Sequence, residues 1–183
     1  MKKHLFNFVL MLFLVFGVSC ATNRPFVQSG LITEKQEVVS FSEVQSILTG
    51  NGIIIPIEKT VKTDRKYALV TKEWVENQFA DSYWRFLNEF NGLYWTLEAW
   101  DCDEFARSAH FLASVLHYKS KQEKTGLCFG EINYITKKWV GHAANIFLYK
   151  EGNKIKVGFF EPQNRKIYEL TPDEKLITLR VVF

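Results

Sequence analysis

The feature that most constrains the fold is an amphipathic helix followed by four strand-like segments in the C-terminal half of the chain. Asp101 is a plausible N-cap, and after it apolar residues recur at helical spacing to about Tyr118. The four later segments are rich in β-branched and aromatic residues, which predicts strands over Leu127–Tyr134, His142–Lys150, Lys154–Glu161 and Leu176–Phe183. We therefore predict an α+β fold in which this helix packs on an antiparallel sheet.

Shorter signals precede this region. Ser42 with Gln45 three residues later forms a predicted capping box, opening a short helix that Gly50 closes. Residues 53–55 are three isoleucines before a proline, which predicts a brief buried strand. Thr71 is expected to cap a long helix that ends at Asn91-Gly92.

The N-terminus has the pattern of an export signal. Lys2 and Lys3 precede an apolar stretch over residues 5–18, which is shorter than the roughly 18 to 20 residues that a membrane-spanning helix needs. Cys20 follows a small residue, as at a bacterial lipoprotein cleavage site, although Gly17 stands where that motif usually has Leu. We predict lipidation of Cys20; an ordinary signal peptide and an uncleaved anchor are the alternatives.

These signals predict the domain organisation and the localisation. Residues 1–19 would be a lipoprotein-type signal peptide, residues 20–30 a lipid-anchored tether, and residues 31–183 a single domain. The protein would lie in the bacterial cell envelope, anchored to a membrane on the periplasmic or outer face. The chain has a net charge of +3 with two of its lysines in the predicted signal, so there is no electrostatic case for binding nucleic acid.

Cys102 is the predicted nucleophile. A cysteine attacks as the thiolate, and the unpaired backbone N–H groups at a helix start favour negative charge. We therefore expect the position of Cys102, directly after Asp101, to lower the pKa of its thiol. A disulfide between Cys102 and Cys128 is the structural alternative, and it would remove the thiolate.

The partners of the cysteine are predicted from a hairpin. Gly152-Asn153 is a tight-turn signal, so residues that face each other across the two flanking strands should have numbers that sum to about 305. Glu161 is then a diagonal neighbour of His142 on the same face of the sheet. This predicts a triad in which Cys102 attacks a carbonyl, His142 is the base, and Glu161 orients the imidazole.

Two polar residues are possible auxiliaries to this triad. Gln163 should lie directly opposite His142 in the predicted register. Asn145 is the rival orienter, but it is three residues from His142 and so should face the other side of the strand.

Three short motifs carry a resemblance to known families. Trp100-Asp101-Cys102-Asp103-Glu104-Phe105-Ala106, Gly141-His142-Ala143-Ala144-Asn145 and Glu161-Pro162-Gln163 resemble the papain-like C-terminal domain of the fungal Marasmius oreades agglutinin and its bacterial and phage relatives. The first motif is also similar to bacterial transglutaminase-like cysteine peptidases. The resemblance implies a papain-like or transglutaminase-like fold and assigns the cysteine, histidine and glutamate of the agglutinin to Cys102, His142 and Glu161.

The resemblance has two further implications. Both families include calcium-dependent members, and Asp101, Asp103 and Glu104 offer the hard oxygen ligands that calcium prefers, although caps and helix-dipole partners explain the same acids. No cofactor is required for the predicted chemistry itself. The agglutinin's sugar-binding β-trefoil has no counterpart here, because the chain has no internal repeats.

These observations predict an exported, lipid-anchored cysteine hydrolase of papain-like type. It would cleave a peptide or amide bond through an acyl-thioester, with a peptide, protein or peptidoglycan substrate in the envelope. The alternative is a noncatalytic envelope lipoprotein that uses the papain-like fold as a binding or assembly module.

Overall fold

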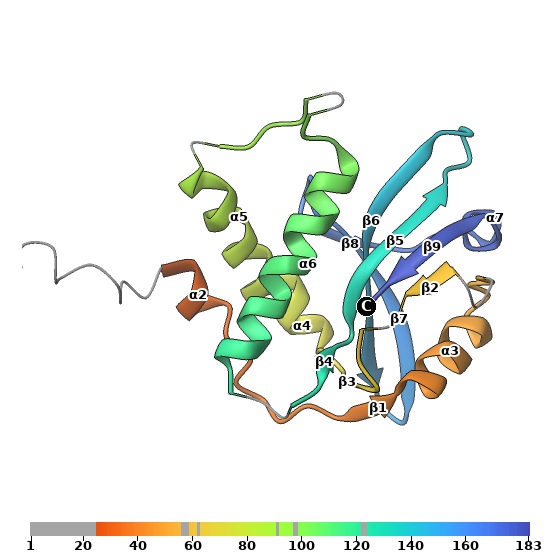
Figure 1. The fold of residues 1–183 in the computed structure, drawn as a ribbon, viewed down its shortest axis with the longest axis horizontal. Coiled ribbons are helices and arrows are strands. Elements are labelled where there is room, and N and C mark those ends of the chain that lie inside the picture. The colour runs from red at the N-terminus through yellow and green to blue at the C-terminus, as the bar shows by residue number, and fades with distance from the viewer. Residues whose placement is uncertain (1–24, 56–58, 62, 91, 97–98, 122–123) are drawn as a thin grey trace, which may run out of the picture.

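A computed structural model describes residues 25–55, 59–61, 63–90, 92–96, 99–121 and 124–183. It has an α+β fold, with helices packed against a six-stranded sheet (Figure 1). The helices are α2 (Pro25–Ser29), α3 (Phe41–Gly50), α4 (Lys72–Trp74), α5 (Ala80–Glu89), α6 (Cys102–Lys119) and α7 (Pro172–Leu176). The strands are β1 (Val38–Ser40), β2 (Thr60–Val61), β3 (Lys66–Ala68), β4 (Gly126–Leu127), β5 (Phe129–Ile135), β6 (Gly141–Glu151), β7 (Lys154–Glu161), β8 (Lys166–Tyr168) and β9 (Thr178–Val182).

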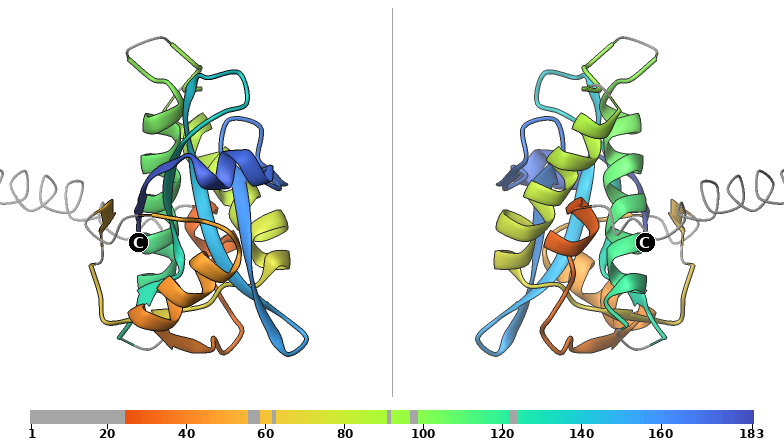
Figure 2. Two further views of the ribbon diagram at one scale, coloured as in Figure 1. Left: turned by 90° about the vertical axis from the view of Figure 1, so that its right-hand side faces the viewer. Right: turned by 90° about the vertical axis from the view of Figure 1, so that its left-hand side faces the viewer.

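The large sheet has the strand order β2-β9-β5-β6-β7-β8, and it is antiparallel except where β2 runs parallel to β9. A smaller sheet has the order β1-β3-β4. In the two side views, α5 and α6 run along the large sheet (Figure 2). These two helices cover one face of the sheet, and α3 lies on the other side (Figure 1).

The core has two parts because the central strands are covered on both faces. One part lies between the helices and the sheet and includes Phe79, Tyr83 and Phe147. The other part includes Val44 of α3 and Phe159 of β7. In β6, every residue from 143 to 149 is buried, as expected for a strand without a solvated face.

The predicted helix over residues 101–118 is confirmed. Asp101 is its N-cap, in an extended conformation, and α6 continues to Lys119. The long helix after Thr71 is also present, with Thr71 as its cap, but the type of helix changes along its length. A short α-helical turn is followed by a π-helical turn over Val75–Phe79, and α5 then ends at Glu89, before the predicted stop.

Two early predictions are wrong in detail. The cap of α3 is Ser40, whose side chain accepts from the backbone N–H of Glu43 while the Glu43 carboxylate accepts from the Ser40 backbone; the predicted cap was Ser42. The three isoleucines after α3 form no strand. Ile53 is buried and Ile55 packs against the same core cluster, whereas Ile54 between them is 59% exposed, so the segment alternates as a strand does but pairs with no other strand among the described residues.

The predicted strand over 127–134 is divided in two. β4 pairs with β3, whereas β5 pairs with β6 and β9, and Cys128 bridges the two sheets through its backbone. Its N–H donates to the carbonyl of Ala68 (2.8 Å), and its carbonyl accepts from Leu148 (3.1 Å). At the C-terminus, the first residues of the predicted strand 176–183 lie instead at the end of α7, and the short β8 was not predicted.

The chain packs from residue 25 onward. Phe26 of α2 is buried, Ser29 Oγ lies 3.1 Å from Ser82 Oγ of α5, and Trp74 Nε1 donates to the carbonyl of Gly30 (2.9 Å). The second half of the predicted tether is therefore attached to the domain. The predicted signal and Cys20 lie outside the described residues. Among the described helices, none has both the length and the apolar character to cross a membrane.

Candidate functional site

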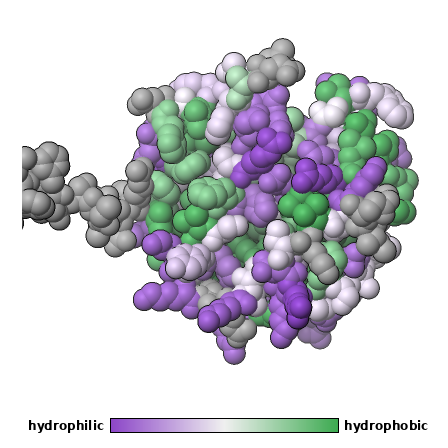
Figure 3. All heavy atoms as spheres, viewed as in Figure 1, coloured by the Kyte–Doolittle hydropathy of each residue, from purple (hydrophilic) through white to green (hydrophobic). Residues whose placement is uncertain are grey.

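The beginning of α6 places Cys102 at the first helical position. The Asp101 side chain accepts from the Asp103 N–H (3.3 Å), and the Glu104 carboxylate accepts from the Asp101 N–H (3.1 Å). This reciprocal capping sets the direction in which the helix starts. Hydrophilic side chains gather over the beginning of α6, with hydrophobic side chains on either side (Figure 3).

The hairpin between β6 and β7 brings His142 and Glu161 together. The strands pair from Glu151 with Lys154 through Asn145 with Phe160, which is the predicted register. Gly152 has the positive φ that a tight turn needs, at 60°. His142 Nε2 lies 2.7 Å from Glu161 Oε2. An ionised carboxylate can only accept, so Nε2 donates and the Nδ1 atom of the ring is left for another partner.

Two tyrosines complete the surroundings of His142. The ring of Tyr134, the partner of His142 across the β5–β6 ladder, meets the imidazole edge to face at 5.6 Å between centroids. Its hydroxyl lies 3.1 Å from that of Tyr168 on β8. Burial raises the pKa of Tyr134 to about 12, so this side chain is neutral at physiological pH. We call Cys102, Tyr134, His142, Glu161 and Tyr168 the polar cluster.

The pKa of the Cys102 thiol differs from the prediction. The thiol lies beside the backbone of Ala143, the residue after His142, and this contact favours the thiolate. Partial burial disfavours the thiolate more strongly than this contact favours it, and the charges of Asp101 and Asp103 disfavour it as well. The pKa of the thiol is therefore raised. The expectation of a lowered pKa is therefore wrong, because partial burial of the sulfur, and after it the charges of the acids that cap the helix, disfavour the thiolate. Both Cys102 and Cys128 are free cysteines.

The two predicted auxiliaries lie in different places. Asn145 is fully buried and points away from the polar cluster, since its Nδ2 donates to the carbonyls of Ala106 (2.9 Å) and Gly130 (3.0 Å). Gln163 is exposed, and its backbone N–H donates to the other oxygen of Glu161 (3.2 Å). Asn145 therefore ties α6 to the sheet, and Gln163 helps to hold the glutamate through its backbone.

The three acids at the start of α6 lie close enough to share a cation. One oxygen from each of Asp101, Asp103 and Glu104 falls within 4.8 Å of the others. Asp103 also has Arg107 at 2.6 Å, and Glu104 has the same guanidinium at 3.3 Å. A hydrogen bond with Asp101, with burial second, raises the pKa of Asp103 to about 6. The donor set fits calcium in chemistry, with Arg107 as a competitor, and a calcium site stays a prediction.

The sequence did not point to Tyr134 and Tyr168 as members of the site. Tyr134 could have been found by extending the strand pairing to β5, because it lies opposite His142. The short strand β8, which supplies Tyr168, has no signal of its own. Exposed aromatic residues also lie near the start of α6, and among them Tyr94 is 75% and Trp95 56% exposed.

Comparison with known proteins gives structural neighbours only. No family model matches the chain, and no curated protein matches it. Solved structures do match it, among them a complex of PSL1a with E64, at 22% identity, and Polyporus squamosus lectin bound to the human-type influenza-binding epitope Neu5Aca2-6Galb1-4GlcNAc, at 23% identity. Each of these two matches has a TM-score of 0.61 and covers 80% of this chain. This chain spans about half of those proteins, 51% and 49% of their lengths.

The likeness confirms the α+β fold and, in part, the resemblance to fungal agglutinins. No match supports the similarity to transglutaminase-like peptidases. The prediction of a cysteine hydrolase, with its peptidase assignment, is contradicted, because the structural neighbours are lectins.

Proposed function

We propose that this protein is a noncatalytic binding module whose ligand contacts the polar cluster. One observation carries the proposal: His142 and Glu161 are already hydrogen-bonded to each other at 2.7 Å. Cys102, which lies against the backbone of Ala143, has a thiol pKa that burial raises, and this supports the same interpretation. Such a site offers a neutral thiol, a carboxylate and an imidazole nitrogen in fixed positions. Fixed polar groups give a binding site its specificity without any covalent step.

A glycan is the ligand class that these groups suit. Sugars present hydroxyl groups, which bind to carboxylate and imidazole, and faces of C–H groups, which pack on aromatic rings. The Glu161 carboxylate and the His142 Nδ1 atom supply the polar contacts, and Trp95 and Tyr94 expose ring surface in the segment that leads into α6. This site would be separate from a lectin β-trefoil, which has no counterpart here; the lectin neighbour shares the fold over about half of its own length.

The compartment suggests which glycans the module meets. The predicted lipid anchor at Cys20 would hold the protein in the cell envelope, where peptidoglycan offers both glycan strands and peptides. A module tethered there binds or helps to assemble wall material and leaves it intact. The glycan strand is the proposed ligand, and the attached peptide is an additional contact.

Binding to isolated peptidoglycan and to soluble N-acetylated oligosaccharides would test the proposal. The full chain is titrated with each, and Glu161→Gln is compared with Glu169→Gln, an exposed glutamate outside the cluster. Loss of a charge-assisted hydrogen bond should weaken binding about tenfold in the first variant and leave the second unchanged.

The noncatalytic part of the proposal needs a separate measurement. Mass spectrometry should recover the oligosaccharide or wall fragment unchanged after incubation with the native protein and with Cys102→Ser alike. Cleavage of the ligand that is lost in Cys102→Ser would overturn the proposal. Equal binding by the Glu161→Gln variant and the native protein would show that the ligand lies elsewhere.

A further inference from the structure

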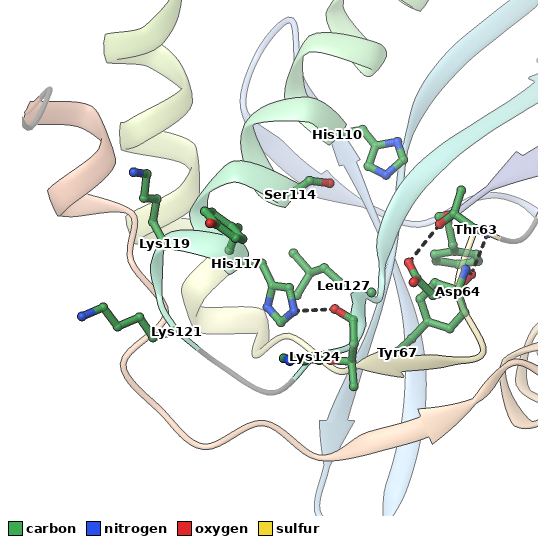
Figure 4. Close-up of a pocket in the computed structure, with 14 residues that line it drawn as sticks. Thr63, Asp64, Tyr67, His110, Ser114, His117, Lys119, Lys121, Lys124 and Leu127 are labelled. Atoms are coloured by element: carbon green, nitrogen blue, oxygen red, sulfur yellow. Dashed lines mark hydrogen bonds between the residues drawn. The ribbon is translucent and has the colours of Figure 1, made fainter. Parts of the chain in front are cut away.

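A cavity of about 720 Å³ lies between the C-terminal half of α6 and strand β3 (Figure 4). Two of the lysines at its rim, Lys119 and Lys121, point away from its interior in Figure 4. The buried His117 beside it is already bonded to the carbonyl of Thr125 (2.9 Å). These groups are therefore not arranged around a ligand. A smaller groove, beside the polar cluster, is lined instead by an exposed tryptophan, Trp139.

This groove lies between the turn that joins β5 to β6 and the helix α7, and we call it the α7 groove. Ile135 and Trp139 line one side, and Asp173 and Leu176 line the other. Its volume is about 310 Å³. This is at the lower end of the range of small-molecule sites, about 300–1,000 Å³, so the groove suits one ring-sized group.

Hydrogen bonds hold the two sides of the α7 groove together. One oxygen of the Glu174 carboxylate accepts from the Lys137 N–H (3.3 Å), and the other accepts from the N–H and the hydroxyl of Thr171 (3.0 and 2.8 Å). The Ile135 N–H donates to the carbonyl of Ile177 (3.1 Å). A ligand therefore meets a groove that needs little ordering, which lowers the entropic cost of binding.

The stability of the fold does not account for Trp139. The side chain is 80% exposed, so it contributes little to the core. Its backbone has a φ of 60°, in the left-handed region where glycine and asparagine are favoured and a bulky side chain is strained. A tryptophan at this position is therefore unfavourable both for the backbone and for the side chain. Strained positions of this kind gather at ligand-binding sites, so Trp139 points to a role in binding.

The α7 groove adjoins the polar cluster. Trp139 is three residues before His142 on the hairpin of β5 and β6. Burial raises the pKa of Tyr134 most, and the charges of Glu174 and Glu161 raise it further. The Tyr134 hydroxyl is therefore near a carboxylate of the groove wall as well as a carboxylate of the cluster. A ligand that binds at the cluster can extend into the groove.

We propose that the α7 groove holds a further sugar ring of the glycan that contacts the polar cluster, an inference that rests on the function proposed above. The C–H face of the ring packs on the indole of Trp139. Its hydroxyl groups donate to the exposed Asp173 carboxylate and accept from the Lys137 ammonium, both of which line the groove. A wholly apolar ligand would leave these two charged groups without contacts, whereas a sugar has both kinds of surface.

NMR titration of the full chain with N-acetylglucosamine and with its linear tetramer, tetra-N-acetylchitotetraose, would test the groove. Trp139→Asn should reduce the affinity for the tetramer about tenfold, because the apolar face of one ring loses its contact, and should leave the affinity for the monosaccharide unchanged. Trp84→Gln is the matched control, since it removes a tryptophan that is 43% exposed on α5. This variant should bind both sugars as the native protein does.

Thermal unfolding separates a binding role from a structural one. Asparagine is favoured at a φ of 60°, so Trp139→Asn should unfold at the same temperature as the native protein or at a higher one. A lower midpoint would show that the indole supports the fold, and it would overturn the inference.

The failure of the groove and the failure of the proposed function give different results. Unchanged affinity of Trp139→Asn for the tetramer, with Glu161→Gln still weakening the binding of both sugars, overturns the groove alone. No saturable binding of either sugar to the native protein overturns the proposed function and the groove together. If Trp139→Asn weakens the binding of a peptidoglycan stem peptide or of phosphatidylglycerol vesicles but not of the tetramer, the groove has a different occupant and the inference is overturned.

Discussion

Replacing Asn145 tests the contact that joins α6 to the sheet. The side chain is fully buried, and its Nδ2 donates to one carbonyl in α6 and to another in β5. In Asn145→Ala both bonds are lost, at about 0.5–1.5 kcal/mol each. Removal of the amide leaves a cavity of roughly 40 Å³, which adds about 1 kcal/mol at 24 cal/mol per Å³. The free energy of unfolding should therefore fall by about 2–4 kcal/mol.

Denaturant unfolding followed by tryptophan fluorescence and circular dichroism would measure this loss. A fall of that size lowers the midpoint of thermal unfolding by about 5–15 °C for a chain of this size. Asn88→Ala is the control, because Asn88 is exposed on α5 and its replacement should change stability by less than about 0.5 kcal/mol. The slope of the denaturation curve should stay the same in both variants.

The variant Asn145→Asp tests the same two hydrogen bonds through the pH dependence of stability. A carboxylate at this position would face two carbonyl oxygens, so burial and repulsion should raise its pKa in the folded state. The protonated acid can still donate one hydrogen bond. Its penalty relative to Asn should then be smallest below the unfolded pKa of about 3.9 and grow as the pH rises. Equal stability of Asn145→Asp and the native protein at pH 7 would refute the proposed role of the two bonds.

Three other perturbations have clear expected outcomes. Because the pKa of Cys102 is raised, alkylation of this thiol at pH 8 should be slower in the native than in the unfolded protein, as followed by mass spectrometry, and rapid native labelling at pH 7 would contradict this. Asp103 has a folded pKa of about 6, above its unfolded value, so its contribution to stability is lost as the pH rises from about 4 through 6. Asp103→Asn should flatten the pH dependence of unfolding in that window, and an unchanged profile would count against the shift. In Gly130→Ala the new Cβ would collide with the carbonyl oxygen of Val182, at a cost of about 1–3 kcal/mol or more in equilibrium unfolding, whereas Gly50→Ala has open space and should lose no stability.

Local signals in the sequence predicted the parts of the site that depend on near neighbours. The turn at Gly152-Asn153 determines the register of β6 and β7, and this register brings His142 within hydrogen-bonding distance of Glu161. The cap at Asp101 likewise places Cys102 at the helix start. Both depend on a few adjacent residues, so they can be read without the rest of the fold.

Other features depend on neighbours that come from elsewhere in the chain. Residues 127–134 have one continuous β pattern, yet they belong to two strands in different sheets. β4 pairs with β3, whereas β5 pairs with β6. Ser42 has the residue types of a cap, but Ser40 takes that role at the end of β1. In both places the strands that pair with the segment decide between local structures that the sequence allows equally.

The sequence by itself determined the α+β class, the helix that begins after Asp101, and the hairpin that sets His142 beside Glu161, because periodicity, capping and turn chemistry are local. Only the tertiary structure decided the pKa of the Cys102 thiol and the existence of the cavity between the C-terminal half of α6 and β3. The pKa of Cys102 depends on how far packing removes the sulfur from water and on how close the Asp101 and Asp103 charges lie. The cavity exists because the end of α6 and strand β3, far apart in sequence, stand next to each other without filling the space between them.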